Sequence, residues 1–270
     1  MHYDPIKRSL GNVFNKSPWL RKLFYRLLDL LLLRTWHVHA ELKRWARENR
    51  QNPAPEILDA GSGFGQYSYY LGKMNSRFRI KAVDVKEEQI ADCSNFFSRV
   101  GLKNVRFETG DLTRLNEPDT YDLILSVDVM EHILEDELVF RNFHKALKPG
   151  GTLIISTPSD QGGSDVGHDE ESSFIEEHVR DGYNINDIQD KLKRAGFSET
   201  RGKYAYGTPG KIAWKISMKW PIVMLGVSKL FFIILPFYYL IFYPPAFLLN
   251  LADVKGNHPT GTGLVIIARK

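Results

Sequence analysis

Three glycines in the stretch ILDAGSGFGQ have a spacing that suggests ligand binding. Gly61, Gly63 and Gly65 follow a short apolar run, where a strand turns into a helix. Glycines there let the backbone approach a ligand and adopt positive φ, and the free N–H groups of a helix start bind carboxylates or phosphates. A tight turn that binds nothing is the alternative. A dinucleotide-binding turn reads G-x-G-x-x-G, and Gln66 stands where its third glycine would be, so the spacing disfavours a nicotinamide dinucleotide.

Three aspartates accompany the glycines. Asp59 lies two residues before Gly61, Asp84 ends the second strand-like run, and Asp111 follows the third in ETGDL. The carboxyl ends of parallel strands meet at one edge of a sheet, where ligands bind. There Asp84 can accept both hydroxyls of a ribose, and Asp111 is placed to accept from an adenine amine. Three acidic side chains disfavour a phosphate-bearing cofactor and favour a ligand with positive charge.

A third group of polar residues lies in VDVMEH. Asp128, Glu131 and His132 stand at positions i, i+3 and i+4, where the fourth strand-like run passes into a helix. His132 is a candidate general base, which would remove the proton from a phenolic or enolic oxygen.

These residues depend on a scaffold in which strand ends lie side by side. From Glu56 onward, short apolar runs alternate with longer helical ones, which indicates a parallel sheet covered on both faces. The expected strands are ILDA, RIKAVDV, VRFETG, YDLILSV, GTLIIST, a run near 198–206 and GLVIIARK. The expected helices are one that starts at Ser17-Pro18, then 36–49, 66–74, 87–100, 134–147 and 184–195.

The motifs DAGSGFG, AVDV, GDL, YDLILSVDVMEH and LKPGGTLIIS, in this order, resemble the sequential motifs of class I S-adenosylmethionine-dependent methyltransferases. The resemblance covers about residues 54–200 and the final strand. It implies an α/β fold with a doubly wound, seven-stranded sheet, whose last strand is antiparallel and inserted between its neighbours. It also implies S-adenosyl-L-methionine as the cofactor.

The resemblance assigns the cofactor site residue by residue. The glycine loop would hold the methionine part, Asp84 the ribose, and Asp111 with the next residue the adenine, on which Val85 would pack. Ser126 and the residue after it would flank the sulfonium. The expected cofactor-binding residues are Asp59, Gly61, Ser62, Gly63, Gly65, Asp84, Val85, Asp111, Leu112, Ser126 and Val127.

The expected catalytic residues are His132, Glu131 and His178. VDVMEH is similar to the region that holds a divalent cation in quinone O-methyltransferases, so Asp128, Glu131 and His132 are an alternative metal site. We favour a loop without a metal, which Glu131 and His132 cap and orient. HVRDGYN resembles the segment that reaches over the substrate in lipid- and quinone-directed members, where His178 and Tyr183 would contact it. A plain surface loop is the alternative there.

Composition indicates a globular protein, with 43% hydrophobic and 25% charged residues. Cys93 is the single cysteine, so an intrachain disulfide is excluded and a reducing compartment is favoured. Residues 1–50 contain eleven Lys/Arg and four Asp/Glu, which makes this arm basic. A basic amphipathic arm can meet nucleic acid or an anionic membrane. We favour the membrane, because the sequence shows no RNA-binding motif and a second basic cluster precedes an apolar run.

That apolar run is KLFFIILPFYYLIFYPPAFLLNL, residues 229–251, and the basic cluster is Lys211, Lys215, Lys219 and Lys229. Pro236, Pro244 and Pro245 are each expected to interrupt a helix. If GLVIIARK returns to the sheet, one span is excluded, and two spans need about 40 apolar residues. A monotopic or re-entrant insert satisfies both constraints. A cover of the active site or an oligomer contact, such as a homodimer interface, is the alternative.

Together these features predict a methyltransferase of a lipophilic, lipid-like or quinone-like acceptor, by O-methylation, at the inner, cytoplasmic face of a membrane. We expect an N-terminal helical arm at 1–52, a cofactor-binding domain at 53–210 and 261–270, and an apolar insert at 211–260. Nucleic acid is not an expected partner. The alternatives are a methyltransferase of a soluble hydrophobic metabolite and a cofactor-binding membrane adaptor without catalysis.

Overall fold

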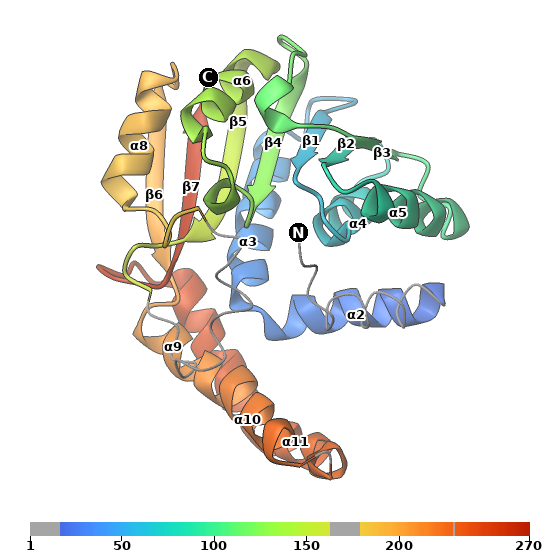
Figure 1. The fold of residues 1–270 in the computed structure, drawn as a ribbon, viewed down its shortest axis with the longest axis vertical. Coiled ribbons are helices and arrows are strands. Elements are labelled where there is room, and N and C mark those ends of the chain that lie inside the picture. The colour runs from blue at the N-terminus through green and yellow to red at the C-terminus, as the bar shows by residue number, and fades with distance from the viewer. Residues whose placement is uncertain (1–16, 163–178, 229) are drawn as a thin grey trace.

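The computed structural model describes residues 17–162, 179–228 and 230–270. Its centre is a seven-stranded sheet in the order β3-β2-β1-β4-β5-β7-β6 (Figure 1). Neighbouring strands run parallel, except that β7 is antiparallel to both β5 and β6. The strands are β1 Glu56–Ala60, β2 Arg79–Asp84, β3 Val105–Thr109, β4 Tyr121–Val127, β5 Leu147–Pro158, β6 Glu199–Ala205 and β7 Gly263–Arg269. The predicted α/β fold and the inserted antiparallel strand are confirmed.

Helices cover both faces of the sheet, which explains the nearly continuous apolar runs of its central strands. Leu123, Ile124 and Leu125 of β4 are all fully buried, although successive side chains of a strand point to opposite faces. Leu123 packs with residues of α3 and α4 on one face, and Ile124 packs with residues of α6 and α8 on the other. The helices of this part are α2 Pro18–Leu31, α3 Leu33–Glu48, α4 Gln66–Met74, α5 Glu87–Arg99, α6 Asp136–Ala146 and α8 Ile185–Arg194.

Most predicted boundaries agree with the structure, and three differ. The first helix begins as expected, with Ser17 accepting a hydrogen bond from the Trp19 N–H at 3.3 Å and with proline in the first turn. The second helix begins at Leu33 instead of residue 36, because only Leu32, which is extended, separates it from the first. A 3-10 turn at Met130–His132 delays α6 to Asp136 instead of residue 134. β5 begins at Leu147, four residues before the predicted strand.

A helical hairpin fills the connection between β6 and β7 and projects from the domain (Figure 1). It contains α9 Thr208–Trp214, a π-helical segment Lys215–Lys219, α10 Trp220–Val227 and α11 Phe231–Lys255. The expectation that prolines interrupt a helix here is wrong, since α11 continues through Pro236, Pro244 and Pro245. Each proline removes one backbone hydrogen bond, and α11 continues despite this loss. Lys229, predicted as part of the basic cluster, lies outside the described residues.

In the part of the chain that the structure describes, α11 is the one helix long and apolar enough to cross a membrane. Only 11% of its most apolar window is buried within the protein. A helix this apolar in the core of a soluble domain would be mostly buried, whereas most of this window of α11 is not buried within the protein.

The base of the hairpin is held by Asp253, near the end of α11. Its carboxylate is fully buried and accepts hydrogen bonds from His37 Nε2 at 2.8 Å, from Tyr206 N at 3.1 Å and from Gly210 N at 3.0 Å. Burial opposes its ionisation, but the hydrogen bond from His37 and the nearby His258 hold the pKa of Asp253 below its ordinary value. Burial also lowers the pKa of His37, so His37 is a neutral donor.

We predict that Asp253→Ala lowers the free energy of unfolding by about 3 kcal/mol, because three buried donors lose one acceptor. Two lowered pKa values also make the wild-type protein less stable in acid. Protonation of His37 favours the unfolded state below its ordinary pKa of about 6.5, and the Asp253 contribution is lost as the pH falls through its lowered pKa. Urea unfolding across this range measures both effects. Asp190→Ala, which removes an exposed ion pair with Lys193, is the control and should cost less than about 1 kcal/mol. Equal losses in the two variants would contradict this role of Asp253.

Candidate cofactor and acceptor site

The glycine loop after β1 has the geometry expected of a ligand-binding turn. Gly61, Gly63 and Gly65 have φ values of 81°, 49° and 74°, which favour glycine. At Gly61 a Cβ would lie 2.2 Å from Val129 Cγ2, so this glycine lets the turns after β1 and β4 touch. At Gly63, by contrast, no atom of the described residues beyond Gly63 and its two chain neighbours lies within 4 Å of where a Cβ would be. The loop is therefore packed on one side and open at Gly63.

Asp84 lies beside this opening. One of its carboxylate oxygens accepts a hydrogen bond from Gly63 N at 2.8 Å, and the other accepts from Lys86 N at 3.0 Å. Each oxygen keeps lone pairs for further donors, such as the hydroxyls of a ribose. Asp84 thus fixes the loop and remains able to bind a ligand.

Asp59, in the strand that precedes the loop, joins β1 to α4. It is buried in β1 and accepts a hydrogen bond from Ser68 Oγ of α4 at 2.5 Å. Burial, with a smaller contribution from Asp84, raises the pKa of Asp59 to about 6. A cation in the crevice would favour the ionised form of this carboxyl.

The other expected cofactor residues lie on the same edge of the sheet. Val85, directly after Asp84, has an exposed fraction of 63%, which leaves its side chain accessible to an aromatic ring. Asp111 accepts hydrogen bonds from Thr113 N and Oγ1, and these bonds lower its pKa. Leu112 is buried and Val127, at the end of β4, is half-buried.

Two buried serine hydroxyls indicate whether a cofactor fits among these residues. Ser62 Oγ in the glycine loop and Ser126 Oγ in β4 have no hydrogen-bond partner within the described ranges. A buried hydroxyl without a partner is costly, and bound water or a ligand is its usual explanation. With the opening at Gly63 and the acidic Asp84, they fit a polar nucleoside that carries positive charge.

The three residues of VDVMEH do not come together as one cluster. Asp128 has a left-handed backbone, with φ of 51°, and pairs with Arg34 of α3. Glu131 is buried and accepts a hydrogen bond from Thr157 Oγ1 at 3.0 Å, whereas His132 is exposed. Over residues 17–162, 179–228 and 230–270, no three His, Cys, Asp or Glu side chains are arranged to hold a metal ion. The alternative metal site therefore has no support from the geometry, while His132 stays a candidate base.

The HVRDGYN segment is described only from Val179, so His178 lies outside the described residues. Tyr183 does not face a substrate as expected. Its side chain is buried, and its hydroxyl donates to Asp136 Oδ2 at 2.8 Å. This tyrosine belongs to the packing between α6 and α8.

Sequence reasoning missed the cover of the crevice. Arg34, which pairs with Asp128, also donates its backbone N–H to Tyr206 Oη at 3.1 Å. Burial opposes its charge, but Tyr67 and Tyr206 raise the pKa of Arg34. Tyr206 directly follows β6 and has a φ of 56°. The position of Tyr206 after a strand was a usable signal, but nothing local marks Arg34.

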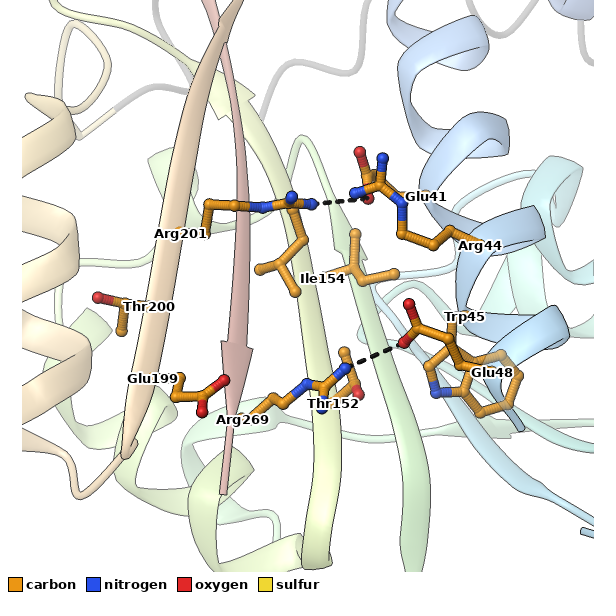
Figure 2. Close-up of a pocket in the computed structure, with 11 residues that line it drawn as sticks. Glu41, Arg44, Trp45, Glu48, Thr152, Ile154, Glu199, Thr200, Arg201 and Arg269 are labelled. Atoms are coloured by element: carbon orange, nitrogen blue, oxygen red, sulfur yellow. Dashed lines mark hydrogen bonds and ion pairs between the residues drawn. The ribbon is translucent and has the colours of Figure 1, made fainter.

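A separate hollow of about 380 Å³ lies between α3 and the strands β5, β7 and β6 (Figure 2). Figure 2 shows Arg201 and Arg269 reaching from the sheet to Glu41 and Glu48 of α3, at 3.3 and 3.0 Å. Thr152, near the start of β5, lines the hollow, whereas the glycine loop follows the end of β1, which is parallel to β5. This hollow is therefore remote from the cofactor crevice, and its ion pairs hold α3 against the sheet.

Known proteins are similar to this chain in sequence. A family profile described as a methyltransferase domain matches residues 51–202. Phosphoethanolamine N-methyltransferase 3 of Arabidopsis thaliana is 31% identical over 159 residues, 54% of this chain and 29% of that protein. The ubiquinone biosynthesis O-methyltransferase of Rickettsia akari is 29% identical over 112 residues, 42% of this chain and 43% of that protein. The chain spans less than half the length of either relative.

The fold is also shared with a solved structure, phosphoethanolamine N-methyltransferase 2 of Haemonchus contortus in complex with S-adenosyl-L-methionine. The TM-score is 0.61, and the match covers 92% of this chain and 60% of that one. Sequence identity is 18%, so this likeness concerns the fold alone.

We predict that cofactor affinity depends on the opening at Gly63 and on Asp84. Gly63→Val should abolish measurable binding of S-adenosylhomocysteine, because the added side chain enters the space left for a ligand. Asp84→Ala should weaken binding by about 10- to 100-fold, which corresponds to roughly 1.5–3 kcal/mol for a hydrogen bond to a charged group. Calorimetry on the folded variants measures both.

Gly150→Val is the matched control. Gly150 has a φ of 78°, and within the described residues no atom lies within 4 Å of its Cβ position. The backbone strain is thus similar, about 1–2 kcal/mol, but the site is at the opposite end of the sheet. Equal losses of affinity in Gly63→Val and Gly150→Val would show that strain, and not occupied space, weakens binding.

Proposed function

The chain belongs to the methyltransferase-domain family, within the class I S-adenosylmethionine-dependent methyltransferases, and from this membership we propose that it methylates a lipophilic acceptor at a membrane surface. The observation that carries this proposal is the apolar hairpin, which leaves the domain at the same edge of the sheet as the crevice. β6 ends at Ala205 and α9 begins at Thr208, so the hairpin leaves the domain at the carboxyl end of a strand. That is the edge of the sheet on which the glycine loop and Asp84 lie.

The exposed apolar surface of the hairpin supports entry into a bilayer without crossing it. Phe237, Leu240 and Ile241 of α11 are exposed, as are Ile222 and Val223 of α10. Soluble monomers rarely expose apolar side chains over so continuous a surface. Both ends of the hairpin return to the sheet, which excludes a single crossing. Two crossings would need a second span, and α11 is the one helix of the described residues long and apolar enough to cross, so we infer a monotopic insertion from one side.

Basic residues stand where the hairpin joins the domain. Lys211 and Lys215 are exposed there. Near an anionic surface each cation contributes about 1 kcal/mol to binding. An anionic leaflet on the cytoplasmic side of a membrane is therefore the proposed location, and a lipid-like or quinone-like molecule within it is the proposed acceptor.

The chain's own residues would prepare the transfer. Bound in the crevice, S-adenosylmethionine supplies an electrophilic methyl group on a sulfonium. Asp84 would hold the ribose, and the loop from Gly61 to Gly65 the methionine part. Glu131, fixed by Thr157, would keep the turn after β4 in place, so that His132 can take the proton from an acceptor hydroxyl. Positioning and exclusion of water supply much of the acceleration in such a displacement.

The names of the relatives indicate two chemistries. One is an O-methyltransferase of ubiquinone biosynthesis, which supports an oxygen acceptor on a quinone-like molecule. The other is named for phosphoethanolamine and for transfer to nitrogen. We favour oxygen, because His132 offers a base and the hairpin favours an acceptor that resides in the bilayer.

The proposal predicts transfer of a labelled methyl group from S-adenosylmethionine to a component of a total membrane lipid extract, identified by mass. Replacing residues 215–243 with a short Gly/Ser linker removes the apolar part and keeps Asp253 and α9. This variant should bind S-adenosylhomocysteine normally, lose flotation with anionic vesicles, and lose most transfer to the membrane-borne acceptor. If the intact protein does not float even at low salt, the hairpin is a lid or an oligomer contact. Labelling of a water-soluble compound alone would favour a soluble acceptor.

A second prediction concerns His132. His132→Ala should lower turnover by about 10²–10⁴-fold, the range for a lost general base, with cofactor affinity nearly unchanged. His144→Ala is the control, because His144 lies on α6 against Phe197 and away from the crevice. Loss of activity on chelation, restored by a divalent ion, would overturn the metal-free mechanism and make Asp128 and Glu131 ligands.

A further inference from the structure

Helix α2 has two faces with different surroundings. Arg21 and Tyr25, one turn apart, have exposed fractions of 3% and 1%. Trp19, Leu27 and Leu30 have exposed fractions of 64%, 41% and 41%. Their spacing of eight and eleven residues places these three on one stripe of the helix.

The buried face is fastened to the glycine loop. Arg21 Nη2 donates to the carbonyl oxygen of Phe64 at 2.9 Å, and its Nη1 donates to the carbonyl oxygen of Asp92 at 3.2 Å. The Tyr25 hydroxyl donates to the same Phe64 carbonyl. Phe64 stands between Gly63 and Gly65, so α2 holds the loop that the cofactor must contact.

A second contact joins α2 to the start of α4. Gln66 Nε2 donates to Asp29 Oδ1 at 2.7 Å. Displacement of α2 would therefore release both the glycine loop and the first residue of the helix that follows it. The position of α2 and the conformation of the cofactor site are energetically coupled.

The exposed face has the composition of an interfacial helix. Its centre is Trp19, Leu27 and Leu30, and Lys22 and Arg26 lie along one edge of the same stripe. Helices with an apolar face and flanking cations lie in the plane of a membrane, with the apolar side chains at the headgroup boundary and the cations near anionic lipid.

The same stripe continues onto the hairpin. Tyr243 Oη of α11 donates to the Leu30 carbonyl at 2.9 Å, and Trp36 Nε1 donates to it at 3.2 Å. The rings of Trp36 and Phe247 pack at 4.9 Å. In Figure 1, α2 lies across the lower side of the domain, below α4 and α5, and the hairpin extends downward from that side. One surface could therefore contact both.

We propose that α2 is a second, in-plane membrane contact, and that binding of its exposed face to an anionic phospholipid surface stabilises the conformation of the glycine loop seen here through Arg21 and Tyr25. This inference rests on the proposed function, because it takes the hairpin as the first membrane contact. The bilayer holds α2 in the position in which the loop binds cofactor. Lipid and cofactor then bind cooperatively, and by thermodynamic linkage each raises the affinity for the other by the same factor.

The test measures S-adenosylhomocysteine affinity in buffer and on vesicles of phosphatidylcholine with and without phosphatidylglycerol. For the wild-type protein, anionic vesicles should raise the affinity by about fivefold or more, the lower end of typical coupling. Saturation with S-adenosylhomocysteine should raise vesicle affinity by the same factor. The variant with Trp19→Ser, Leu27→Ser and Leu30→Ser should keep the wild-type affinity in buffer, and anionic vesicles should not raise it. Its vesicle affinity should fall by about tenfold or more, since the variant lacks three apolar side chains that the membrane would bury in part.

Two further measurements separate the outcomes. Arg21→Lys keeps a positive charge but not the planar, forked guanidinium, so it should bind vesicles normally and lose the effect of lipid on cofactor affinity. If the wild-type protein floats with vesicles but its cofactor affinity is the same on and off them, the inference is wrong and the proposed function stands. If it does not float, the proposed membrane location fails and the inference with it. A wild-type dimer that the triple variant cannot form would show that this face contacts a second copy, which also overturns the inference.

Discussion

The buried carboxylate of Asp253 is the contact on which the placement of the other parts depends. It lies where α11 returns to the sheet, and its hydrogen-bond donors come from α3, from the residue after β6 and from α9. On α3, His37 lies one turn after Arg34, whose backbone N–H is bonded to Tyr206. A charge away from water is tolerated only with its partners in place. Asp253 therefore holds α11, α9, α3 and the turn after β6 in one arrangement.

The sheet and the cofactor loop could be predicted because their signals are local. Apolar runs such as YDLILSV, and a glycine turn followed by helix 66–74, do not depend on distant residues. The features that could not be predicted from the sequence depend on contacts between segments that are distant in the chain. Arg34 meets Asp128, and Arg21 meets Phe64, through docking of the N-terminal helices. The prediction for the prolines was wrong because a rule for single residues was applied to α11, whose backbone is helical throughout. The roles of the site residues stay predictions, since geometry shows where Asp84 and His132 lie, not what they bind.

The proposed cofactor site would match in charge one state of its ligand. Burial and the neighbouring Asp84 raise the pKa of Asp59 to about 6, so ionisation there is costly in the free protein. A sulfonium nearby would offset this cost. Methyl transfer removes the positive charge from the sulfur, and the spent cofactor loses that attraction. If Asp59 and Asp84 line the cofactor site as proposed, the carboxylates that favour the substrate form of the cofactor would also favour release of its product form.

The place of β7 in the sheet has a consequence for how the protein is made. β7 follows all other strands in the sequence, yet it lies between β5 and β6. The hairpin leaves the ribosome before β7, when the sheet still lacks the strand that joins β6 to β5. Chains fold from their N-terminal part during synthesis, and apolar surface exposed at that stage leads to aggregation. The exposed apolar side chains of α10 and α11 are therefore expected to need shielding during translation, before β7 completes the sheet.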